Sequence, residues 1–314
     1  MKVLVVGAAG QVGRSLVQQA ATGGDEVVAT YNSRRPTVPA AAVEALDKTD
    51  AARCTEVIGR HRPELVVDTG ALHNVDYCEG HPEEALRVNR DGTRFLAEAA
   101  ASVGARFVFV STDFVFDGRK SGPYVESDPP KPESHYAESK LAGERAALAA
   151  SPDNLVVRPS VIYSWLDSRT RAESSSGKGM NFGTWLVEEV GHGRPVRIIQ
   201  DQVASPTLAE DLAAAILALV RAGAHGTFHA AGATPATRYD FSVELVRRVG
   251  LDPAHVRPVQ TAELNQKARR PVNSSLSSDY LAQVSGYRTL SLPSALDRFA
   301  QAFSDDPGAP RGSP

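Results

Sequence analysis

Short apolar segments alternate with longer amphipathic ones through the first half of the chain. Residues 2–6 form a continuous apolar run rather than an alternating one, as expected for a strand that is covered on both faces. Four comparable runs follow, at 26–30, 64–68, 105–111 and 154–159. The segments between them carry helical periodicity. This alternation predicts an α/β fold in which helices cover both faces of a parallel sheet.

The pattern changes in the second half. Residues 167–179 are polar and rich in serine and glycine, so we expect a mobile loop there and a candidate lid. Helical periodicity returns at 181–192, and further strands are predicted at 196–199 and 226–230. From Arg238 onward, amphipathic helices and proline-rich loops are typical of a smaller domain packed over the edge of the sheet.

Composition limits the class of protein. The chain has 314 residues, 42% of them hydrophobic, and a formal charge of −3, which fits a soluble globular protein of one or two domains. The balanced charge offers no basic stripe for nucleic acid, and no apolar run approaches the roughly 20 residues of a membrane helix. We therefore expect neither partner. Because an apolar strand starts at Lys2 without a charged leader or cleavage site, the expected location is cytoplasmic.

The positions of cysteine and histidine argue against a metal site. Cys54 and Cys78 are the two cysteines, and they lie in no metal-ligand spacing. The eight histidines are scattered along the chain without a metal-binding motif. We interpret both cysteines as reduced structural thiols.

A glycine-rich loop follows the first predicted strand directly. Gly7, Gly10 and Gly13 have the spacing G-x-x-G-x-x-G, and a helical pattern begins after them. A strand, a glycine loop and a helix in this order are typical of dinucleotide-binding sites. The glycines allow a tight turn and a close approach to a pyrophosphate, which N–H groups at the helix start then hold. We therefore predict a Rossmann-type, doubly wound sheet that binds a dinucleotide.

The end of the second predicted strand indicates which dinucleotide is bound. An NAD site usually has an acidic residue there for the ribose 2′-hydroxyl, whereas an arginine suits the 2′-phosphate of NADP. Here Arg34 and Arg35 follow the strand, and no acidic residue does. We therefore predict NADP(H) as the preferred cofactor, with Arg34 in contact with it, and NAD(H) as the alternative. Both arginines could instead belong to an ordinary solvated loop.

Tyr136 and Lys140 are candidates for proton transfer. They lie four residues apart in a predicted helix, so their side chains share one face. A tyrosine with an ordinary pKa of roughly 10 is a poor proton donor at neutral pH, but a nearby cation lowers that pKa. The pair is therefore a plausible general acid for a carbonyl oxygen.

Polar and small residues follow the carboxyl ends of two predicted strands. Thr112 and Asp113 come after the fourth strand, and residues 70–72 come after the third. Open α/β sheets bind their ligands at this edge. We therefore expect both segments to border the same site as the glycine loop.

Taken together, these motifs resemble those of extended short-chain dehydrogenases, and more narrowly those of the dTDP-4-dehydrorhamnose reductase family. The resemblance rests on the glycine loop, on Tyr136-x-x-x-Lys140 and on the run S-T-D-F-V-F-D-G at 111–118. Further matching segments span nearly the whole chain and are G-Q-V-G at 10–13, V-D at 75–76, V-N at 88–89, D-Q-V-A-S-P-T at 201–207 and R-P-V-N-S at 270–274.

The resemblance implies a role for each motif. Tyr136 would donate the proton, Lys140 would lower its pKa and bind the nicotinamide ribose, and Thr112 would hydrogen-bond the substrate carbonyl. Asp113 would contact the sugar, and Asn89 is implied near the site as well. The reduced nicotinamide would supply the hydride. The implied cofactor contacts are Gly10, Gln11 and Val12 at the pyrophosphate, Asp47 and Lys48 at the adenine end, and Gly70, Ala71 and Leu72 in the middle.

The expected organisation follows from the same resemblance. Residues 1–160 would form the dinucleotide-binding domain, and about 196–232 would return to it. Residues 161–303 would mainly form a smaller substrate-binding domain, with a nucleotide sugar as the substrate and a homodimer as a possible assembly. Residues 304–314, rich in proline, glycine and aspartate, would be a disordered tail.

Two positions depart from the family pattern. The family's reductases usually have a tryptophan after the fifth strand that packs on the sugar, and Val161 stands at the matching position. Phe114 stands where the family commonly has tyrosine, which removes one hydroxyl. Both departures leave the identity of the sugar open.

The leading hypothesis is an NADPH-dependent reductase of a 4-keto, nucleotide-linked deoxysugar. One alternative is a non-catalytic NADP-binding regulatory protein, because the regulatory beta subunit of methionine adenosyltransferase resembles the same family and shares the G-T-F-H run at 226–229. A second alternative is an NAD-dependent nucleotide-sugar dehydratase or epimerase. Dehydratases carry Thr-Asp-Glu where this chain has Thr112-Asp113-Phe114, so the missing carboxylate counts against them.

Overall fold

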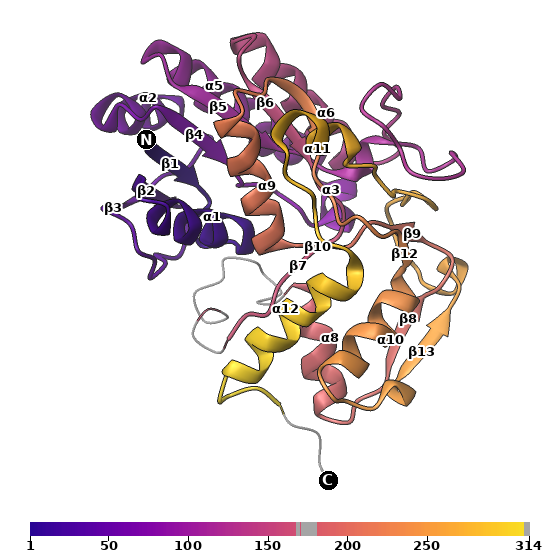
Figure 1. The fold of residues 1–314 in the computed structure, drawn as a ribbon. Coiled ribbons are helices and arrows are strands. Elements are labelled where there is room, and N and C mark those ends of the chain that lie inside the picture. The colour runs from indigo at the N-terminus through magenta and orange to yellow at the C-terminus, as the bar shows by residue number, and fades with distance from the viewer. Residues whose placement is uncertain (168–169, 171–180, 311–314) are drawn as a thin grey trace.

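The structure is a computed structural model that describes residues 1–167, 170 and 181–310 (Figure 1). Most of the predicted lid at 167–179 therefore lies outside the described residues. The strands of the central sheet are β1 (Lys2–Val6), β2 (Glu26–Tyr31), β3 (Ala42–Ala45), β4 (Leu65–Asp68), β5 (Arg106–Val110), β6 (Leu155–Arg158) and β11 (Gly226–His229). The helices of the first half are α1 (Gln11–Thr22), α2 (Ala51–His61), α3 (Val75–Gly80), α4 (Pro82–Leu86), α5 (Gly92–Ser102) and α6 (His135–Ala150).

Among the described residues, the second half contributes further helices and three short pairs of strands. Its helices are α8 (Phe182–Gly191), α9 (Ala209–Arg221), α10 (Arg238–Arg248), α11 (Asp279–Ser285) and α12 (Leu292–Asp305). Its remaining strands are β7 (Ile162–Tyr163), β8 (Val196–Ile199), β9 (Val203–Ala204), β10 (Thr207–Leu208), β12 (Ala236–Thr237) and β13 (Val256–Val259). No helix among the described residues is long and apolar enough to cross a membrane.

The central sheet is parallel throughout and runs in the order β11-β6-β5-β4-β1-β2-β3. The chain moves outward from β1 in one direction and then returns to continue from β4 in the other. The loops after these two strands therefore diverge, which is where sheets of this kind bind ligands. This topology confirms the predicted Rossmann-type, doubly wound α/β fold.

Alternate side chains of each strand enter two separate cores. Val3 and Val5 pack in the layer formed with α1 and α9, whereas Leu4 and Val6 pack in the layer formed with α2 and α5. All four side chains are at most 3% exposed. A strand buried on both faces needs apolar residues at every position, which explains the continuous run in the sequence.

A third core holds the smaller domain together, and α8, α10 and α12 surround it in Figure 1. Leu186, Phe241 and Phe299, one from each helix, are at most 1% exposed. The strand β8 pairs in parallel with β13 at the side of this core. We expected about 196–232 to return to the first domain. Within this range β11 joins the central sheet beside β6 and α9 packs in the core with α1, whereas β8 pairs with β13 instead.

The expectation that residues 304–314 form a disordered tail was wrong for the residues of this segment that the structure describes. Ser304 and Asp305 belong to α12, and the Asp306 carboxylate accepts a hydrogen bond of 3.1 Å from the Trp165 indole. Ala309 is 8% exposed and packs in the third core. The polar composition of this segment suggested disorder, but the hydrogen bond to the Trp165 indole and the packing of Ala309 attach the segment to the third core. Residues 311–314 lie outside the described residues.

Candidate functional site

The glycine loop between β1 and α1 is shaped for a close approach of backbone to ligand. Gly7 has a φ of +82°, and a Cβ placed on Gly13 would lie 2.3 Å from the Gly7 carbonyl oxygen. A side chain at either position would therefore force the loop to move. The helix α1 begins after Gly10 without a side-chain cap, so its first N–H groups can bind an anion. The loop fits a dinucleotide pyrophosphate.

Gln11 and Val12 take different parts in this loop. The Val12 side chain is buried in the core, so only its backbone can face a ligand. The Gln11 side chain instead reaches the second half of the chain. Its Nε2 donates to the Ile162 carbonyl at 3.3 Å, and its Oε1 accepts from the Ser164 hydroxyl at 3.0 Å. Gln11 therefore ties the loop to the connection that leads into the smaller domain.

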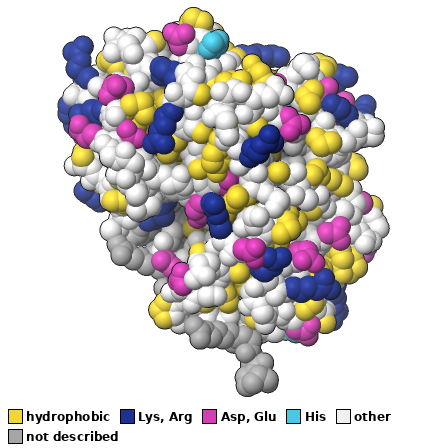
Figure 2. Space-filling view, viewed as in Figure 1, with side chains coloured by type: hydrophobic (Ala, Val, Ile, Leu, Met, Phe, Trp, Pro, Cys, Tyr) yellow, Lys and Arg dark blue, Asp and Glu magenta, His cyan; other side chains and the backbone are white. Residues whose placement is uncertain are grey.

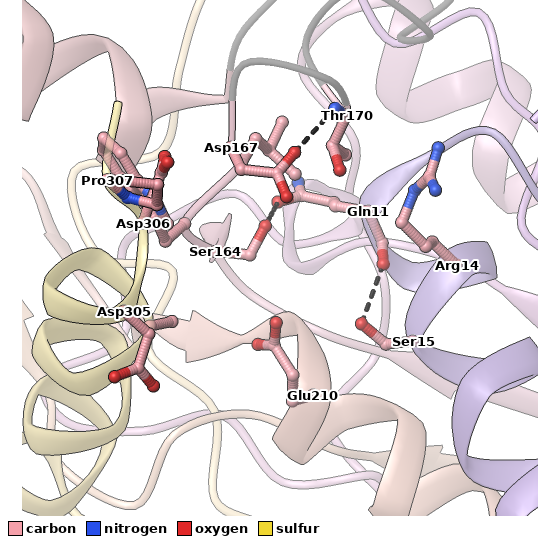
Figure 3. Close-up of a pocket in the computed structure, with 13 residues that line it drawn as sticks. Gln11, Arg14, Ser15, Ser164, Asp167, Thr170, Glu210, Asp305, Asp306 and Pro307 are labelled. Carbon is pink, nitrogen blue, oxygen red and sulfur yellow. Dashed lines mark hydrogen bonds between the residues drawn. The ribbon is translucent and has the colours of Figure 1, made fainter. Parts of the chain in front are cut away.

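A pocket of about 300 Å³ borders Gln11 (Figure 3). The pocket lies between the start of α1, residues 164–167, the start of α9 and the end of α12. Glu210 and Asp305 line it across from Gln11 and Arg14. Tyr136 and Thr112 do not line it. The pocket therefore adjoins the pyrophosphate loop and is separate from the candidate reaction centre.

The residues predicted for the adenine end lie after β2 and β3. Arg34 and Arg35 are exposed in the connection between these strands. The strand β3 itself was missed from the sequence, because its four residues are only partly buried and carry no apolar run. Asp47 follows it, and its exposed carboxylate accepts from the N–H and hydroxyl of Thr49 at 2.9 and 2.8 Å.

Lys48, in contrast, is buried and faces inward. Its ammonium donates to the Asp68 carboxylate, to the Gly70 carbonyl at 2.9 Å and to the Thr93 hydroxyl at 3.1 Å. Three bonds use all three N–H donors of an ammonium. The side chain therefore holds the loop after β4 in place, and the predicted cofactor contact of Lys48 stays a prediction.

Asn89 connects that same loop to α6, the helix that carries Tyr136. Its amide accepts from the Leu72 N–H at 2.9 Å and donates to the Leu72 carbonyl and to the Ser139 hydroxyl, both at 3.0 Å. A π-helical turn at Arg87–Asp91 separates α4 from α5. Such turns place a side chain where regular helix geometry would not. The structure thereby supplies the polar partners that a buried asparagine requires.

Thr112 and Asp113 lie at the carboxyl end of β5, beneath Tyr136. The Thr112 hydroxyl donates to Asp113 Oδ1 at 3.1 Å, and the Ser160 hydroxyl donates to Asp113 Oδ2 at 2.7 Å. Asp113 is 3% exposed. Burial raises the pKa of the Asp113 carboxyl, and the hydroxyls of Ser274, Ser160 and Thr112 oppose this rise. Sequence reasoning missed Ser160, although it follows Pro159 at the carboxyl end of β6.

Tyr136 sits in a largely apolar surrounding with Leu72, Cys78 and Phe114. The Phe114 ring meets its ring edge-on, with centroids 6.1 Å apart. Burial raises the pKa of Tyr136, Thr112 opposes the rise through a hydrogen bond, and the charge of Asp113 adds to it. The phenol therefore keeps its proton at neutral pH, as a proton donor must before the reaction.

Lys140 lies one helical turn further into the protein. Its Nζ donates to the Val110 carbonyl at 2.7 Å and lies 4.0 Å from the centroid of the Phe109 ring. Burial, followed by the charge of Lys48, lowers the pKa of Lys140 to about 7, against the attraction of Asp68 and Glu144. The expected lowering of the Tyr136 pKa by Lys140 is not present in this arrangement, because the amine points to the strand carbonyl and is itself partly neutral.

Fold and site together define the class of protein. A parallel sheet with a glycine loop after its first strand, and a tyrosine and lysine on a helix beside a threonine, are the features of an extended short-chain dehydrogenase. Residues 1–304 match the family model described as the RmlD substrate binding domain. The chain belongs to this family of NAD(P)H-dependent oxidoreductases, which confirms the resemblance seen in the sequence.

Relatives cover most of the chain. The dTDP-4-dehydrorhamnose reductase of Mycobacterium tuberculosis (strain H37Rv) is 38% identical over 283 residues, covering 88% of this chain and 85% of the relative. A probable low-salt glycan biosynthesis reductase of Haloferax volcanii is 33% identical over 308 residues, and the match covers 97% of this chain and 99% of the relative. A Clostridium acetobutylicum dTDP-4-dehydrorhamnose reductase structure superposes with a TM-score of 0.83 at 30% identity, covering 97% of this chain and all of that one (100%).

Proposed function

We propose that the protein reduces the 4-keto group of a nucleotide-linked deoxysugar with NADPH. The observation that carries the proposal is the meeting of a protonated Tyr136 with Thr112 and Asp113 at the sheet edge that also holds the glycine loop. Relatives support the substrate class, since they are named reductases of dTDP-4-dehydrorhamnose and of dTDP-4-keto-6-deoxy-D-glucose. A Bacillus anthracis relative, 26% identical with a TM-score of 0.84, was solved in complex with NADP.

Each residue has a stated part in the proposed reaction. Tyr136 donates its proton to the carbonyl oxygen, while Thr112 holds that oxygen by a hydrogen bond. Asp113 accepts hydrogen bonds from sugar hydroxyls. Lys140 binds the nicotinamide ribose, and a bound nicotinamide supplies hydride to the carbonyl carbon. The predicted cofactor contacts are Gly7, Gly10, Gln11, Val12, Gly13, Arg34, Asp47, Lys48, Gly70, Ala71 and Leu72, together with Tyr136 and Lys140.

The G-T-F-H run that suggested a regulatory protein has a structural explanation in the fold. Gly226–His229 is strand β11, and the His229 side chain is completely buried beside Phe116. Burial lowers the pKa of His229 to about 3, so the ring is neutral. The run forms the outer strand of the central sheet, and this structural role gives no support to a regulatory function.

Replacing Tyr136 by phenylalanine tests the proposal. Removal of the donor hydroxyl should lower kcat by roughly 10²- to 10⁴-fold, while the Kd for NADPH stays unchanged because the ring still packs against Phe114. The assay follows nicotinamide absorbance with a panel of nucleotide-linked 4-keto sugars. Tyr77→Phe is the matched control, since its hydroxyl pairs with Glu84 on the surface. Wild-type turnover by Tyr136→Phe would refute the assigned acid, and no turnover of the panel by the wild type would refute the reductase.

Two further parts of the proposal concern the whole protein. We propose a cytoplasmic location and assembly into a homodimer. Light scattering during size-exclusion chromatography checks the assembly, and a single species at the monomer mass of 33.4 kDa would contradict it.

A further inference from the structure

Glu144 and Arg158 form an ion pair in the interior of the protein. Figure 2 shows charged side chains scattered over the surface, where water solvates them. Glu144 and Arg158 are instead 3% and 4% exposed. The guanidinium donates from Nε to Glu144 Oε1 at 2.8 Å and from Nη2 to Glu144 Oε2 at 2.6 Å. Because apolar residues often replace such a pair without loss of stability, stability alone does not explain its presence.

The Glu144 carboxylate joins a helix to the ends of two strands. Glu144 belongs to α6, and its Oε1 also accepts from the Ser111 hydroxyl at 2.6 Å, directly after the end of β5. Arg158 is the last residue of β6. The Ser111 N–H donates to the Val157 carbonyl of β6 at 2.7 Å, so the strand ends are also bonded to each other. We call the bonds of the carboxylate to Ser111 and Arg158 the Glu144 contact.

Each segment of the Glu144 contact leads to a residue of the candidate reaction centre. Tyr136 lies two turns before the glutamate, on the buried side of α6. Thr112 directly follows the serine of the contact, and Ser160 follows its arginine by two residues. The Ser160 hydroxyl donates to Asp113 at 2.7 Å. The Glu144 contact therefore lies where the helix of the phenol meets both strands that carry its neighbours.

The packing of α6 around the Glu144 contact leaves little room for adjustment. A Cβ placed on Gly143 would lie 2.3 Å from the Asn89 carbonyl oxygen and 2.9 Å from the Phe109 ring. One turn earlier, Lys140 Nζ donates to the Val110 carbonyl of β5 at 2.7 Å. The Glu144 contact adds the end of β6 to these contacts. Alignment of this kind matters because a misplacement of about 1 Å can slow a reaction by about 10²-fold.

We propose that Glu144 is a positioning residue, which holds Tyr136 in line with Thr112. Because its carboxylate is buried, it acts through Ser111 and Arg158 and not by touching the substrate. This inference rests on the proposed function and adds the group that aligns the proton donor with the carbonyl oxygen. An ion pair with a purely structural role would contribute to stability and leave the rate of the folded enzyme unchanged.

Glu144→Leu combined with Arg158→Met tests the inference, because it removes both charges together and leaves neither unpaired. We expect the double variant to unfold in urea near the wild-type midpoint and to bind NADPH with the wild-type Kd. Its kcat should fall by about 10- to 100-fold, while KM for the ketosugar changes by less than about threefold. Glu138→Leu is the control, since this glutamate lies on the exposed side of the same helix, and it should match the wild type.

A probe at Tyr136 separates this inference from the proposed function. In protein labelled with fluorotyrosine, the fluorine NMR signal assigned through Tyr136→Phe should shift in the double variant and stay in place in Glu138→Leu. If the wild type reduces no ketosugar but this signal shifts, the proposed reaction fails and the positioning of Tyr136 by Glu144 stands. A folded double variant with wild-type kcat, or with an unmoved signal, would overturn the role of Glu144.

Ser111→Ala carries the test if the double variant does not fold. It removes one hydroxyl of the Glu144 contact and keeps the ion pair. We expect kcat to fall by about 3- to 10-fold and the Tyr136 signal to shift. Ser111→Thr keeps the hydroxyl and should recover most of the activity. Wild-type kcat and an unmoved signal in Ser111→Ala would then assign the ion pair to stability alone and overturn the inference.

Discussion

Burial shifts the pKa values of Tyr136 and Lys140, the two side chains to which we assign proton donation and cofactor binding. It raises the pKa of the Tyr136 phenol and lowers the pKa of the Lys140 amine to about 7, so each group is shifted toward its neutral form. Helical spacing alone suggested a charged lysine acting on the tyrosine. In the structure, burial instead raises the pKa of the Tyr136 phenol, and the Lys140 amine has a pKa near neutral.

The depressed pKa of Lys140 should appear in the pH dependence of stability. Above about pH 7 the folded amine is neutral, whereas the unfolded amine keeps its proton up to roughly pH 10.4, so unfolding takes up a proton. Raising the pH between these values therefore stabilises the fold, by at most about 1.4 kcal/mol per pH unit. Urea unfolding of wild type and Lys140→Met across pH 7 to 10 measures this. Parallel pH curves for the two proteins would contradict the shift.

Arg34 decides the choice of cofactor in our proposal. Replacement by alanine should remove attraction to the 2′-phosphate and lower the ratio of kcat/KM for NADPH over NADH by about tenfold or more, in keeping with a charge-assisted contact of about 1.5–3 kcal/mol. Steady-state rates with each cofactor give the ratio. Arg62→Ala, in the exposed turn after α2, is the control. An unchanged ratio would leave Arg34 as an ordinary surface residue.

Val161 carries backbone strain at the position where the family usually has tryptophan. Its φ is +41°, a region that β-branched residues rarely adopt. Its carbonyl accepts from the Thr207 N–H at 3.1 Å, and the preceding Ser160 holds Asp113. Strain of this kind persists where surrounding contacts fix the backbone. The strained Val161 thus directly follows Ser160, the residue that donates to Asp113.

At the scale of elements, the π-helical turn that carries Asn89 links the loop after β4 to α6. Asn89→Leu removes three hydrogen bonds, leaves the Leu72 N–H without its partner and leaves the Leu72 carbonyl with only the weak Cys78 thiol as a donor. We expect NADPH to bind roughly tenfold more weakly and the free energy of unfolding to fall by about 2–4 kcal/mol. Fluorescence titration and urea unfolding measure the two effects. The control is Asn265→Leu on the surface. Full NADPH affinity in a folded Asn89→Leu protein would contradict the link.

The sequence predicted best those strands and loops whose conformation follows from a single physical requirement. The continuous runs of β1 and β4 and the glycines at Gly7 and Gly13 follow from burial and backbone geometry alone. Strand β3 was missed because an edge strand needs no apolar pattern, and the turn at Arg87–Asp91 was missed because residues on both sides favour helix.

At the scale of the molecule, the C-terminal segment closes the third core. Removing residues 304–314 should lower the free energy of unfolding by about 2 kcal/mol, since the Trp165 indole loses its carboxylate partner and Ala309 no longer covers apolar side chains. Urea unfolding followed by tryptophan fluorescence measures this. Removal of residues 311–314 alone should leave stability near that of the full chain. Equal stability of both truncated proteins and the full chain would contradict a structural role for 304–310.

The placement of α12 also bears on how the protein is made. Phe299 and Phe303 complete the third core, and both come after α8 and α10 along the chain. The outer strand of the central sheet, β11, is likewise synthesised long after its neighbour β6. A growing chain therefore carries unfinished apolar surfaces until α12 has been made, a condition in which nascent proteins aggregate readily. We expect the smaller domain to fold only once α12 has left the ribosome, and to depend on chaperones until then.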